Sequence, residues 1–463
     1  MTPELEQPTL QEQFEAVILT EDRLAIRAFL DDQLISDVAN LVDEYPDYQG
    51  QIIANMSVHR AASVFKILDL SIQKSVIRDL PPNTTASLLN ELPADDRTDF
   101  LEELPSNAVR ELIKLLDPEE RKITLSLLGY PENSIGRLMT PDYVYVYPWN
   151  SIEEVFTTIR KFGKDSETIN VIYVINDKGE LLDDIRIREF ILNPPDKKVS
   201  ELMDDRFIAL RPEDDQESAA EVFKMNNRVA LPVVSKSNKL LGIVTIDDIL
   251  WVTAEEFSED MQKMGGTEAL NEPYLEMPIF RLFKKRIVWL VILFMGELLT
   301  ASAMAYFEDE IKQAVVLALF VPLIISSGGN SGSQASTLII QAMAVGEITI
   351  KDWWRVMRRE IISGLLLGSV LGLIGFFRIY AWHVFAPGIY SEHWAPVGIT
   401  VGITLLGVVL WGTITGSMLP LLLKRLGADP AVSSAPFVAT LVDVTGLILY
   451  FSVAYSLLQG TLL

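Results

Sequence analysis

After Arg286 the chain alternates between long apolar runs and short polar connections. Five apolar runs can be distinguished: Ile287–Phe307, Gln313–Gly346, Ile361–Phe377, Trp394–Leu423 and Ala431–Leu463. Roughly 20 apolar residues span the hydrocarbon core of a bilayer, so each run is long enough or nearly so. Helices satisfy their own backbone hydrogen bonds in lipid. We therefore predict an all-α, polytopic membrane domain of five transmembrane helices over residues 284–463.

Basic residues gather in alternate connections between these runs. They are Lys284, Lys285 and Arg286 before the first run, Lys351, Arg355, Arg358 and Arg359 between the second and third, and Lys424 and Arg425 between the fourth and fifth. Such connections face the cytoplasm. Residues 1–15 lack the basic and apolar regions of a secretory signal. We expect a multi-pass protein of the cell (inner) membrane, with the N-terminus cytoplasmic and the C-terminus outside.

A leucine recurs every twelve residues in the polar first part of the chain, at Leu68, Leu80, Leu92, Leu104 and Leu116. Proline follows the second, third and fourth of these leucines, and Asp117–Pro118 interrupts the last copy. Proline is favoured in the first turn of a helix, so the period predicts short helices stacked in a superhelix. We assign residues 1–130 to this α-helical domain. Asp95 and Asp99, four residues apart, share one helix face, where exposed helix acids are the simpler interpretation.

A second repeat has a spacing of 64 residues and begins at Met139 and Met203. Each copy reads as strand, helix, two β-branched strands joined by a turn, then helix. The segments Leu231-Pro-Val-Val and Gly242–Leu250 resemble CBS domains, whose pairs form α/β regulatory modules. The resemblance implies a CBS pair over residues 131–250, with ATP as a candidate ligand because many such pairs bind adenine nucleotides.

An acidic helix is predicted between this pair and the membrane, within residues 251–283. Its acids are Glu255, Glu256, Glu259 and Asp260, and Gly265–Gly266 ends it. The formal net charge of −24 lies almost wholly before Arg286, because from that residue on ten acids are nearly balanced by nine bases. Such a surface repels nucleic acid and attracts cations.

The residue types available limit the metals that the chain can bind. There is no cysteine and there are three histidines, so disulfides and thiolate sites are excluded. Oxygen ligands favour Mg²⁺, Ca²⁺ or Mn²⁺.

Two features inside the membrane part carry candidate chemistry. The first is the polar, glycine-containing stretch Pro322–Thr337, in which the glycines weaken a helix and the side chains supply oxygen atoms. A pore lining and a small-residue packing surface both fit it. The second is Asp443, alone in an apolar run at a cost of at least ~2.5 kcal/mol, for which a cation is the natural counter-charge. Glu297 raises the same question in the first run. The candidate pore-lining residues are Ser327, Gly328, Gly329, Asn330 and Thr440.

The order of these parts, with SSGGNSGSQASTLIIQA at 326–342 and RLGADPAVSSAPFVATLVDVTGLILYF at 425–451, resembles the bacterial MgtE family of Mg²⁺ channels. The resemblance implies a homodimer with the pore on its two-fold axis, selectivity for Mg²⁺, and closure when cytosolic Mg²⁺ binds the acidic domains. It also implies the ion-binding residues, which would be Asp443 and Asp429 in the membrane part, and Asp95, Asp99, Gly136, Asp215, Glu217, Asp248, Glu256, Glu259 and Asp260 in the cytoplasmic part.

Three other functions compete with this interpretation. A proton-coupled transporter of Mn²⁺ or Co²⁺ would use Asp443 and Glu297 as relay groups. A membrane enzyme would need an acid–base pair, and the sequence shows no P-loop or zinc motif, so we do not expect an enzyme. A chloride channel with CBS domains would need more spans.

Overall fold

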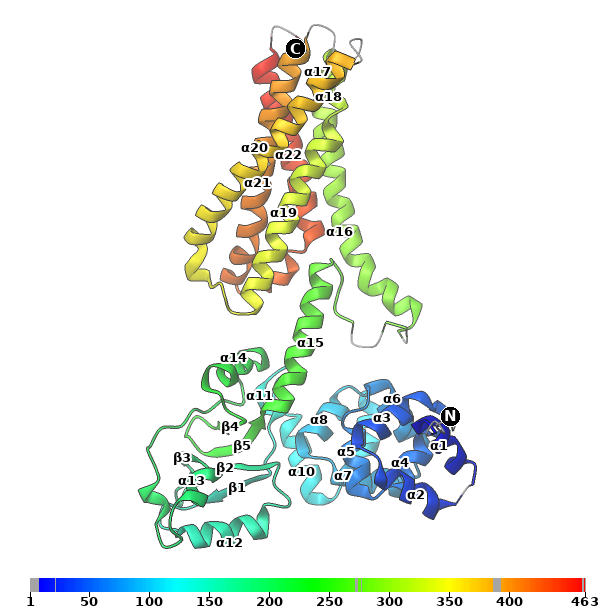
Figure 1. Cartoon of the computed structure of the whole chain (residues 1–463), viewed down its shortest axis with the longest axis vertical. Coiled ribbons are helices and arrows are strands. Elements are labelled where there is room, and N and C mark those ends of the chain that lie inside the picture. The colour runs from blue at the N-terminus through cyan, green and yellow to red at the C-terminus, as the bar shows by residue number, and fades with distance from the viewer. Residues whose placement is uncertain are drawn as a thin grey trace, which may run out of the picture. The chain divides into compact units, whose positions relative to one another are not determined.

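The computed structural model describes residues 8–20, 22–270, 274–275, 277–385, 393–459 and 462. The chain forms two compact units, Met1–Thr253 and Ala254–Leu463. Helix α15 (Ile246–Met264) passes from the first unit into the second (Figure 1).

Short helices make up the first part of unit one (Figure 1). They are α1 (Leu10–Ile18), α2 (Arg23–Asp32), α3 (Ile35–Glu44), η1 (Pro46–Tyr48), α4 (Gln49–Asn55), α5 (Val58–Phe65), α6 (Leu70–Asp79), α7 (Pro82–Glu91), α8 (Ala94–Glu102), α9 (Ser106–Ile113), α10 (Pro118–Leu127) and α11 (Ile135–Leu138). Helices α6 to α10 start at residues 70, 82, 94, 106 and 118, so the predicted twelve-residue period is confirmed. Asp117–Pro118 moves the proline by one position, but α10 still begins in phase.

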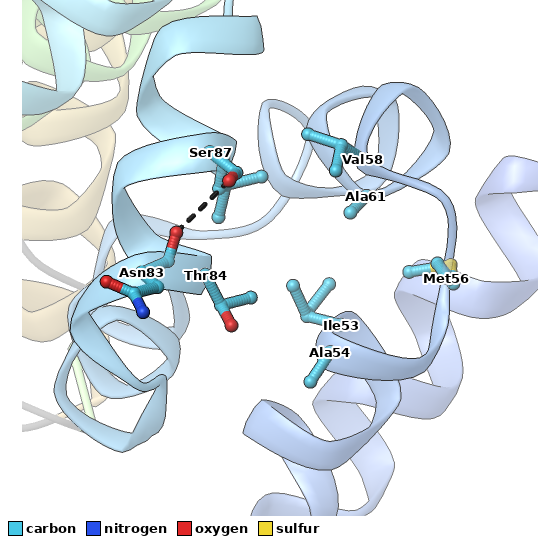
Figure 2. Close-up of a pocket in the computed structure, with 9 residues that line it drawn as sticks. Ile53, Ala54, Met56, Val58, Ala61, Asn83, Thr84 and Ser87 are labelled. Carbon is cyan, nitrogen blue, oxygen red and sulfur yellow. Dashed lines mark hydrogen bonds between the residues drawn. The ribbon is translucent and has the colours of Figure 1, made fainter. Parts of the chain in front are cut away.

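The periodic leucines hold these helices together. Leu68, Leu80, Leu92 and Leu116 are buried in one apolar core, and Leu104 packs on it. Each leucine lies just before a helix, so its side chain fills the angle between successive helices. A cavity of about 230 Å³ opens between α4, α5 and α7 (Figure 2). No titratable side chain is among the residues that line it, which are Ile53, Ala54, Met56, Val58, Ala61, Asn83, Thr84, Ser87 and Leu88.

The rest of unit one contains two α/β copies, but the strand predicted at the start of the second copy is reduced to a single bridge between Leu210 and Val233. The first comprises β1 (Tyr143–Val146), α12 (Ile152–Phe162), β2 (Thr168–Ile175), β3 (Leu181–Arg186) and α13 (Ile187–Leu192), followed by η2 (Val199–Glu201); the second comprises α14 (Gln216–Asn226), β4 (Ala230–Val234) and β5 (Leu240–Thr245). Helices α12 and α14 begin and end 64 residues apart. The sheets have the orders β1-β2-β3 and β4-β5, with β1 parallel to β2 and the other pairs antiparallel.

Two buried aspartates explain why the first copy departs from the CBS pattern. Asp183 accepts hydrogen bonds from the backbone N–H groups of Asp204 and Asp205, at 2.8 and 3.2 Å. Asp184 pairs with Arg228 of the second copy, Nη1 to Oδ2, at 2.8 Å. These side chains therefore fasten the first copy to the linker and to the second copy.

Unit two contains five described helices that are long and apolar enough to cross a membrane, which agrees with the prediction. The helices of this unit are α16 (Ile279–Tyr306), α17 (Glu308–Gln313), α18 (Val315–Ala318), α19 (Val321–Ala344), η3 (Ile350–Asp352), α20 (Trp353–Phe385), α21 (Trp394–Arg425), η5 (Pro430–Val432) and α22 (Ala435–Leu458). Helices α19, α20, α21 and α22 lie side by side in one bundle, and α16 runs along α22 (Figure 1).

The glycines of α19 serve helix packing, which corrects the expectation that they weaken the helix. Helix α19 is continuous, and Gly328 and Gly332 are buried in it. A Cβ atom on Gly412 or Gly416 of α21 would lie only 2.5 or 2.1 Å from the backbone oxygen of Gly328 or Gly332. Without side chains at these four positions, the two helices approach closely, as small residues allow in membranes.

Candidate metal sites

Acidic side chains from three parts of unit one meet around the start of α8. Asp95 and Asp96 lie in its first turn, Glu167 comes just before β2, and Asp247 and Asp248 lie in the first turn of α15. Asp95 is only 6 % exposed, and its Oδ1 atom has no hydrogen-bond partner among the described residues. We call these five residues the acidic cluster.

Burial raises the pKa of four carboxyls in the acidic cluster, which are those of Asp95, Asp96, Glu167 and Asp248. Burial raises the pKa of Asp95 well above its usual range, and the charges of Asp248, Asp96 and Glu167 raise it further. Burial also raises the pKa of Asp248 to about 7, although a hydrogen bond from Thr245 opposes this shift. Carboxylates that repel one another where they are partly buried from water are stabilised by a cation that binds between them.

Lys66 neutralises only part of this cluster. Its Nζ atom lies 3.4 Å from Oδ2 of Asp96, and burial raises the pKa of Asp96 even so. Sequence reasoning identified Asp95 and Asp248 but missed Asp96, Glu167 and Asp247. The neighbouring positions 96 and 247 offered a signal, whereas nothing in the sequence places Glu167 there. Asp99 is exposed on the same helix, one turn away.

Gly136, Asp215 and Glu217 belong to a second place in unit one. Gly136 N donates to the backbone oxygen of Pro212 at 2.9 Å, so α11 lies beside the segment that leads into α14. Asp215 caps α14 by accepting a hydrogen bond from Glu217 N at 2.9 Å. The structure brings these three residues into one neighbourhood, and α11 also packs against α8, which carries Asp95 and Asp96 of the acidic cluster.

In unit two, the predicted sites on α15 and at Asp429 share a lysine. Glu256, Glu259 and Asp260 lie on α15 and are half-buried. Lys263, also on α15, pairs with Glu259, and its Nζ atom lies 2.7 Å from Oδ2 of Asp429. Sequence reasoning missed Lys263, although its position four residues after Glu259 is the spacing of a helical ion pair.

Asp443 lies on α22 where α19 and α16 approach. A Cβ atom on Gly329 of α19 would lie 3.2 Å from Oδ1 of Asp443. In the described part of the chain, the charged side chain that acts on Asp443 is Glu297 of α16. Helix α16 approaches α22 closely here, since a Cβ atom on Gly296 would lie 2.4 Å from Cγ2 of Thr440. Two acids thus face one region of the membrane bundle.

The other predicted pore residues divide between exposed and packed positions. Asn330 is exposed on α19, and its Nδ2 atom lies 3.4 Å from Oγ of Ser326. Ser327 donates to the backbone oxygen of Leu323 at 2.6 Å, and Thr440 to that of Pro436 at 3.0 Å. Gly328 is buried against Val408 of α21 and Val442 of α22. It therefore contributes to helix packing, and we do not include it among the proposed pore-lining residues.

None of these places is a completed metal site. Over the residues that the structure describes, no three His, Asp or Glu side chains are arranged to hold one ion. An ion at the acidic cluster or at Asp443 would therefore keep part of its water shell, as Mg²⁺ usually does.

Comparison with known proteins identifies the family. The family model for the MgtE intracellular N domain matches residues 33–133, a CBS domain model matches 199–255, and the MgtE model, described as a divalent cation transporter, matches 321–453. The magnesium transporter MgtE of Thermus thermophilus is 38 % identical over 351 residues, which cover 76 % of either chain. The chain belongs to the MgtE family. The MgtE of Bacillus subtilis is 30 % identical over 345 residues, 74 % of either chain.

Solved structures agree with this assignment for the polar part of the chain. A crystal structure of the cytosolic domain of the Mg²⁺ channel MgtE in complex with ATP has a TM-score of 0.50 and 33 % identity, and covers 52 % of this chain and 98 % of its own. The soluble part of a magnesium transporter has a TM-score of 0.51 at 24 % identity, over 54 % of this chain and 99 % of its own, and supports the fold. The resemblance to MgtE and the predicted fold class are both confirmed.

Proposed function

We propose that this protein conducts Mg²⁺ across the inner membrane as a homodimer and closes when cytosolic Mg²⁺ binds its acidic domains. Its relatives in Thermus thermophilus and Bacillus subtilis are named magnesium transporters. The proposed parts are an N domain over 1–130, a CBS pair over 131–250, a connecting segment over 251–283 and a pore domain over 284–463. The N-terminus would lie in the cytoplasm and the C-terminus outside.

The observation that carries the proposal is the placement of Asp443 beside Gly329. A carboxylate at membrane depth is costly unless a cation accompanies it. The side chain that acts on it among the described residues is another acid, Glu297, so the protein's own charges increase this need. Gly329 lets the backbone of α19 approach Asp443 closely, because even a methyl group there would lie 3.2 Å from Oδ1 of Asp443.

A second copy of the chain would complete the pore. Ser326, Asn330 and Gln334 are spaced one helical turn apart on α19 and are exposed in the single chain. Polar side chains in lipid face other helices or water. Two copies of this stripe around a two-fold axis would line an aqueous path, and two Asp443 side chains would form a ring that holds Mg²⁺ directly or through its water.

The acidic cluster is suited to act as the sensor for closing. At 4 Å, two carboxylates repel by about 4 kcal/mol at an effective dielectric constant of 20. An ion placed between Asp95 and Asp248 changes that repulsion into two attractions. Since α8 belongs to the helical domain and α15 leads to the membrane, Mg²⁺ would favour one packed arrangement of these elements.

The remaining predicted residues would add weaker ions or a nucleotide. Gly136, Asp215 and Glu217 lie together at the α11–α14 contact, while Glu256 and Asp260 lie farther along α15. The related cytosolic domain was solved with ATP, so we propose ATP as a ligand of the CBS pair. Isothermal titration with ATP tests this binding, and the absence of any heat of binding would exclude it.

The experiment that tests the function is ion flux into liposomes. We expect the protein to pass Mg²⁺ and to lose that flux in Asp443→Asn, which keeps the side-chain volume and removes the charge. Thr445→Val on the same helix is the matched control. Thr445 Oγ1 accepts a hydrogen bond from Trp411 Nε1 at 2.9 Å. Two residues after Asp443, its side chain leaves α22 on roughly the opposite side. Full flux in Asp443→Asn would contradict the proposal.

The same assay tests the proton-coupled alternative. A carrier that exchanges Mn²⁺ or Co²⁺ for protons would acidify or alkalinise the liposome lumen as metal enters, and a pH gradient would drive it. A channel gives metal flux that follows the metal gradient and membrane potential alone. We expect the second behaviour, with Mg²⁺ preferred.

A further inference from the structure

The end of α15 lies against the base of the helix that carries Asp443. Gly266 follows the last turn of α15 and has a φ of +74°. A Cβ atom on Gly266 would lie 3.4 Å from Cγ of Pro436 and 3.6 Å from Oγ of Ser434. Ser434 caps α22 by accepting a hydrogen bond from Phe437 N at 3.3 Å. Pro436 and Asp443 are two turns apart, roughly 10 Å along the axis. Movement of this end of α15 therefore reaches the pore helix directly.

Lys263 makes the polar part of this contact. Its ammonium group pairs with Glu259 on its own helix and lies 2.7 Å from Oδ2 of Asp429, in the segment that leads into α22. The other oxygen of Asp429, Oδ1, accepts a hydrogen bond from Ala431 N at 2.8 Å. Both oxygens of Asp429 are thus engaged. The lysine and aspartate side chains are 26 % and 34 % exposed, so water screens the pair only in part.

We propose that Lys263 is a built-in cation that latches the connecting helix to the membrane bundle between Glu259 and Asp429, where the family resemblance predicts Mg²⁺. An ammonium group carries a compact charge and three donors on a flexible stem, which suits it to two carboxylates. Because this charge belongs to the chain, the joint is held at any Mg²⁺ concentration. Ion sensing is then left to other acids, above all the acidic cluster. The link to gating rests on the proposed function, whereas the latch itself does not.

Removing the lysine would convert the joint into an ion-dependent one. In Lys263→Met, Glu259 and Asp429 face each other without a counter-charge, so they repel in chelator and can be bridged by a divalent ion. In Asp429→Asn, the amide oxygen still caps Ala431, but a pair with opposite charges is lost and Mg²⁺ has one carboxylate fewer to bind. The two variants should therefore respond to Mg²⁺ in different ways.

Hydrogen exchange measured by mass spectrometry on the full chain tests this prediction at the joint itself. The reporting amides are Gly265, Gly266 and Thr267, which donate to backbone oxygens of Met261, Lys263 and Gln262. We expect equal protection of these amides in wild type with chelator or millimolar Mg²⁺. In Lys263→Met, the protection of these amides should fall roughly threefold to tenfold in chelator and return with Mg²⁺. In Asp429→Asn, the protection should be lost in both conditions. Lys263→Arg, which keeps the charge, should stay close to wild type.

Two results of the exchange experiment would overturn the latch. One is full protection of Lys263→Met in chelator; the other is recovery of Asp429→Asn with Mg²⁺ to the same extent as Lys263→Met. Flux gives a separate readout, in which Lys263→Met should need several-fold more Mg²⁺ to close. Closure at lower Mg²⁺ would mean that the lysine competes with the ion, and would also overturn the latch. A wild type that passes no Mg²⁺ would refute the proposed function and leave the exchange result standing.

Discussion

A Cβ atom on Gly329 would lie 3.2 Å from Oδ1 of Asp443 and 3.4 Å from Cβ of Ala439. The first distance is tighter than ordinary van der Waals contact, so an alanine at 329 would push against the carboxylate. We expect Gly329→Ala to lower Mg²⁺ flux about fivefold, which corresponds to ~1 kcal/mol, and Gly329→Val to lower it more. Flux into liposomes measures this effect.

Gly407→Ala on α21 is the matched control, because the nearest atom to its added Cβ is the flexible end of Leu449 at 3.2 Å. It should leave flux within about twofold of wild type. Equal loss of flux in the Gly329 and Gly407 variants would mean that the effect comes from helix packing in general.

Gly416 should be required for folding of the membrane bundle and not for ion selectivity. Its added Cβ would lie 2.1 Å from the backbone oxygen of Gly332, and neither backbone can move without separating α21 from α19. We expect Gly416→Ala to destabilise the bundle by ~1–3 kcal/mol. Thermal unfolding in detergent measures this destabilisation. Gly427→Ala cannot serve as the control, because φ at Gly427 is +78° and alanine would be strained there. An unchanged melting temperature would show that the helices can move apart at little cost.

Several parts of this arrangement could be predicted from the sequence because they depend on local pattern. The twelve-residue leucine period sets the starts of α6 to α10, and the 64-residue repeat sets the bounds of α12 and α14. Asp443 attracts attention because one charge in an apolar run is costly wherever the helix packs. Each of these inferences needs only spacing along the chain.

What could not be predicted depends on contacts between distant segments. Glu167 joins the acidic cluster only because β2 begins near α8, and the spacing of residues along the sequence does not predict this proximity. Lys263 bridges Glu259 and Asp429, which are separated by much of the membrane domain in sequence. Gly328 and Asn330 are two residues apart on α19, yet one is buried against α21 and α22 while the other is exposed. Composition treats both as one polar stretch.

Asp95 should control closing more strongly than Asp99. Asp95 is buried in the acidic cluster with an unpartnered Oδ1 atom in the described structure, whereas Asp99 is exposed. Asp95→Asn removes a carboxylate that burial and three neighbouring acids disfavour. We expect it to stabilise unit one without Mg²⁺ by ~1 kcal/mol or more, and to raise the Mg²⁺ needed for closure at least fivefold. Thermal unfolding in chelator and flux inhibition measure the two effects.

The matched variant Asp99→Asn should change both quantities by less than about twofold in concentration or ~0.5 kcal/mol in stability. If Asp99→Asn instead shifts closure as much as Asp95→Asn does, the ion is bound at the exposed face of α8 and not in the buried cluster.

The acidic cluster also predicts how closing depends on pH. Burial raises the pKa of Asp248 to about 7 and that of Asp95 in the same direction, from 3.8. Because the folded state binds these protons more tightly than the unfolded state, the stability of unit one without Mg²⁺ is highest at low pH and falls as pH rises toward about 7. Mg²⁺ must displace the protons, so its binding has the opposite dependence.

We therefore expect the Mg²⁺ concentration for half-closure to rise by about tenfold per pH unit below 7 for each proton displaced, and to level off above 8. Flux inhibition measured between pH 6 and 8.5 checks this dependence. In Asp95→Asn/Asp248→Asn, the pH dependence should be lost together with most of the sensitivity to Mg²⁺. A pH dependence that survives in this variant would place the titrating groups elsewhere.

Glu297 remains the group whose role separates a channel from a proton-coupled carrier. It acts on Asp443 across the α16–α22 contact, where Gly296 lets α16 come close to Thr440. In a channel, a second acid beside the ion path raises the local cation concentration, so Glu297→Gln should lower flux severalfold at low Mg²⁺ and little at saturating Mg²⁺. In a carrier, a relay group is indispensable, so the same change should abolish flux at every concentration and remove its response to a pH gradient. Measuring flux against Mg²⁺ concentration, with and without a pH gradient, distinguishes the two outcomes. We expect the behaviour of a channel. Glu297 is exposed on α16, whose contact with the rest of the bundle runs mainly along α22. An exposed acid at this position can concentrate cations without changing its protonation in each transport cycle.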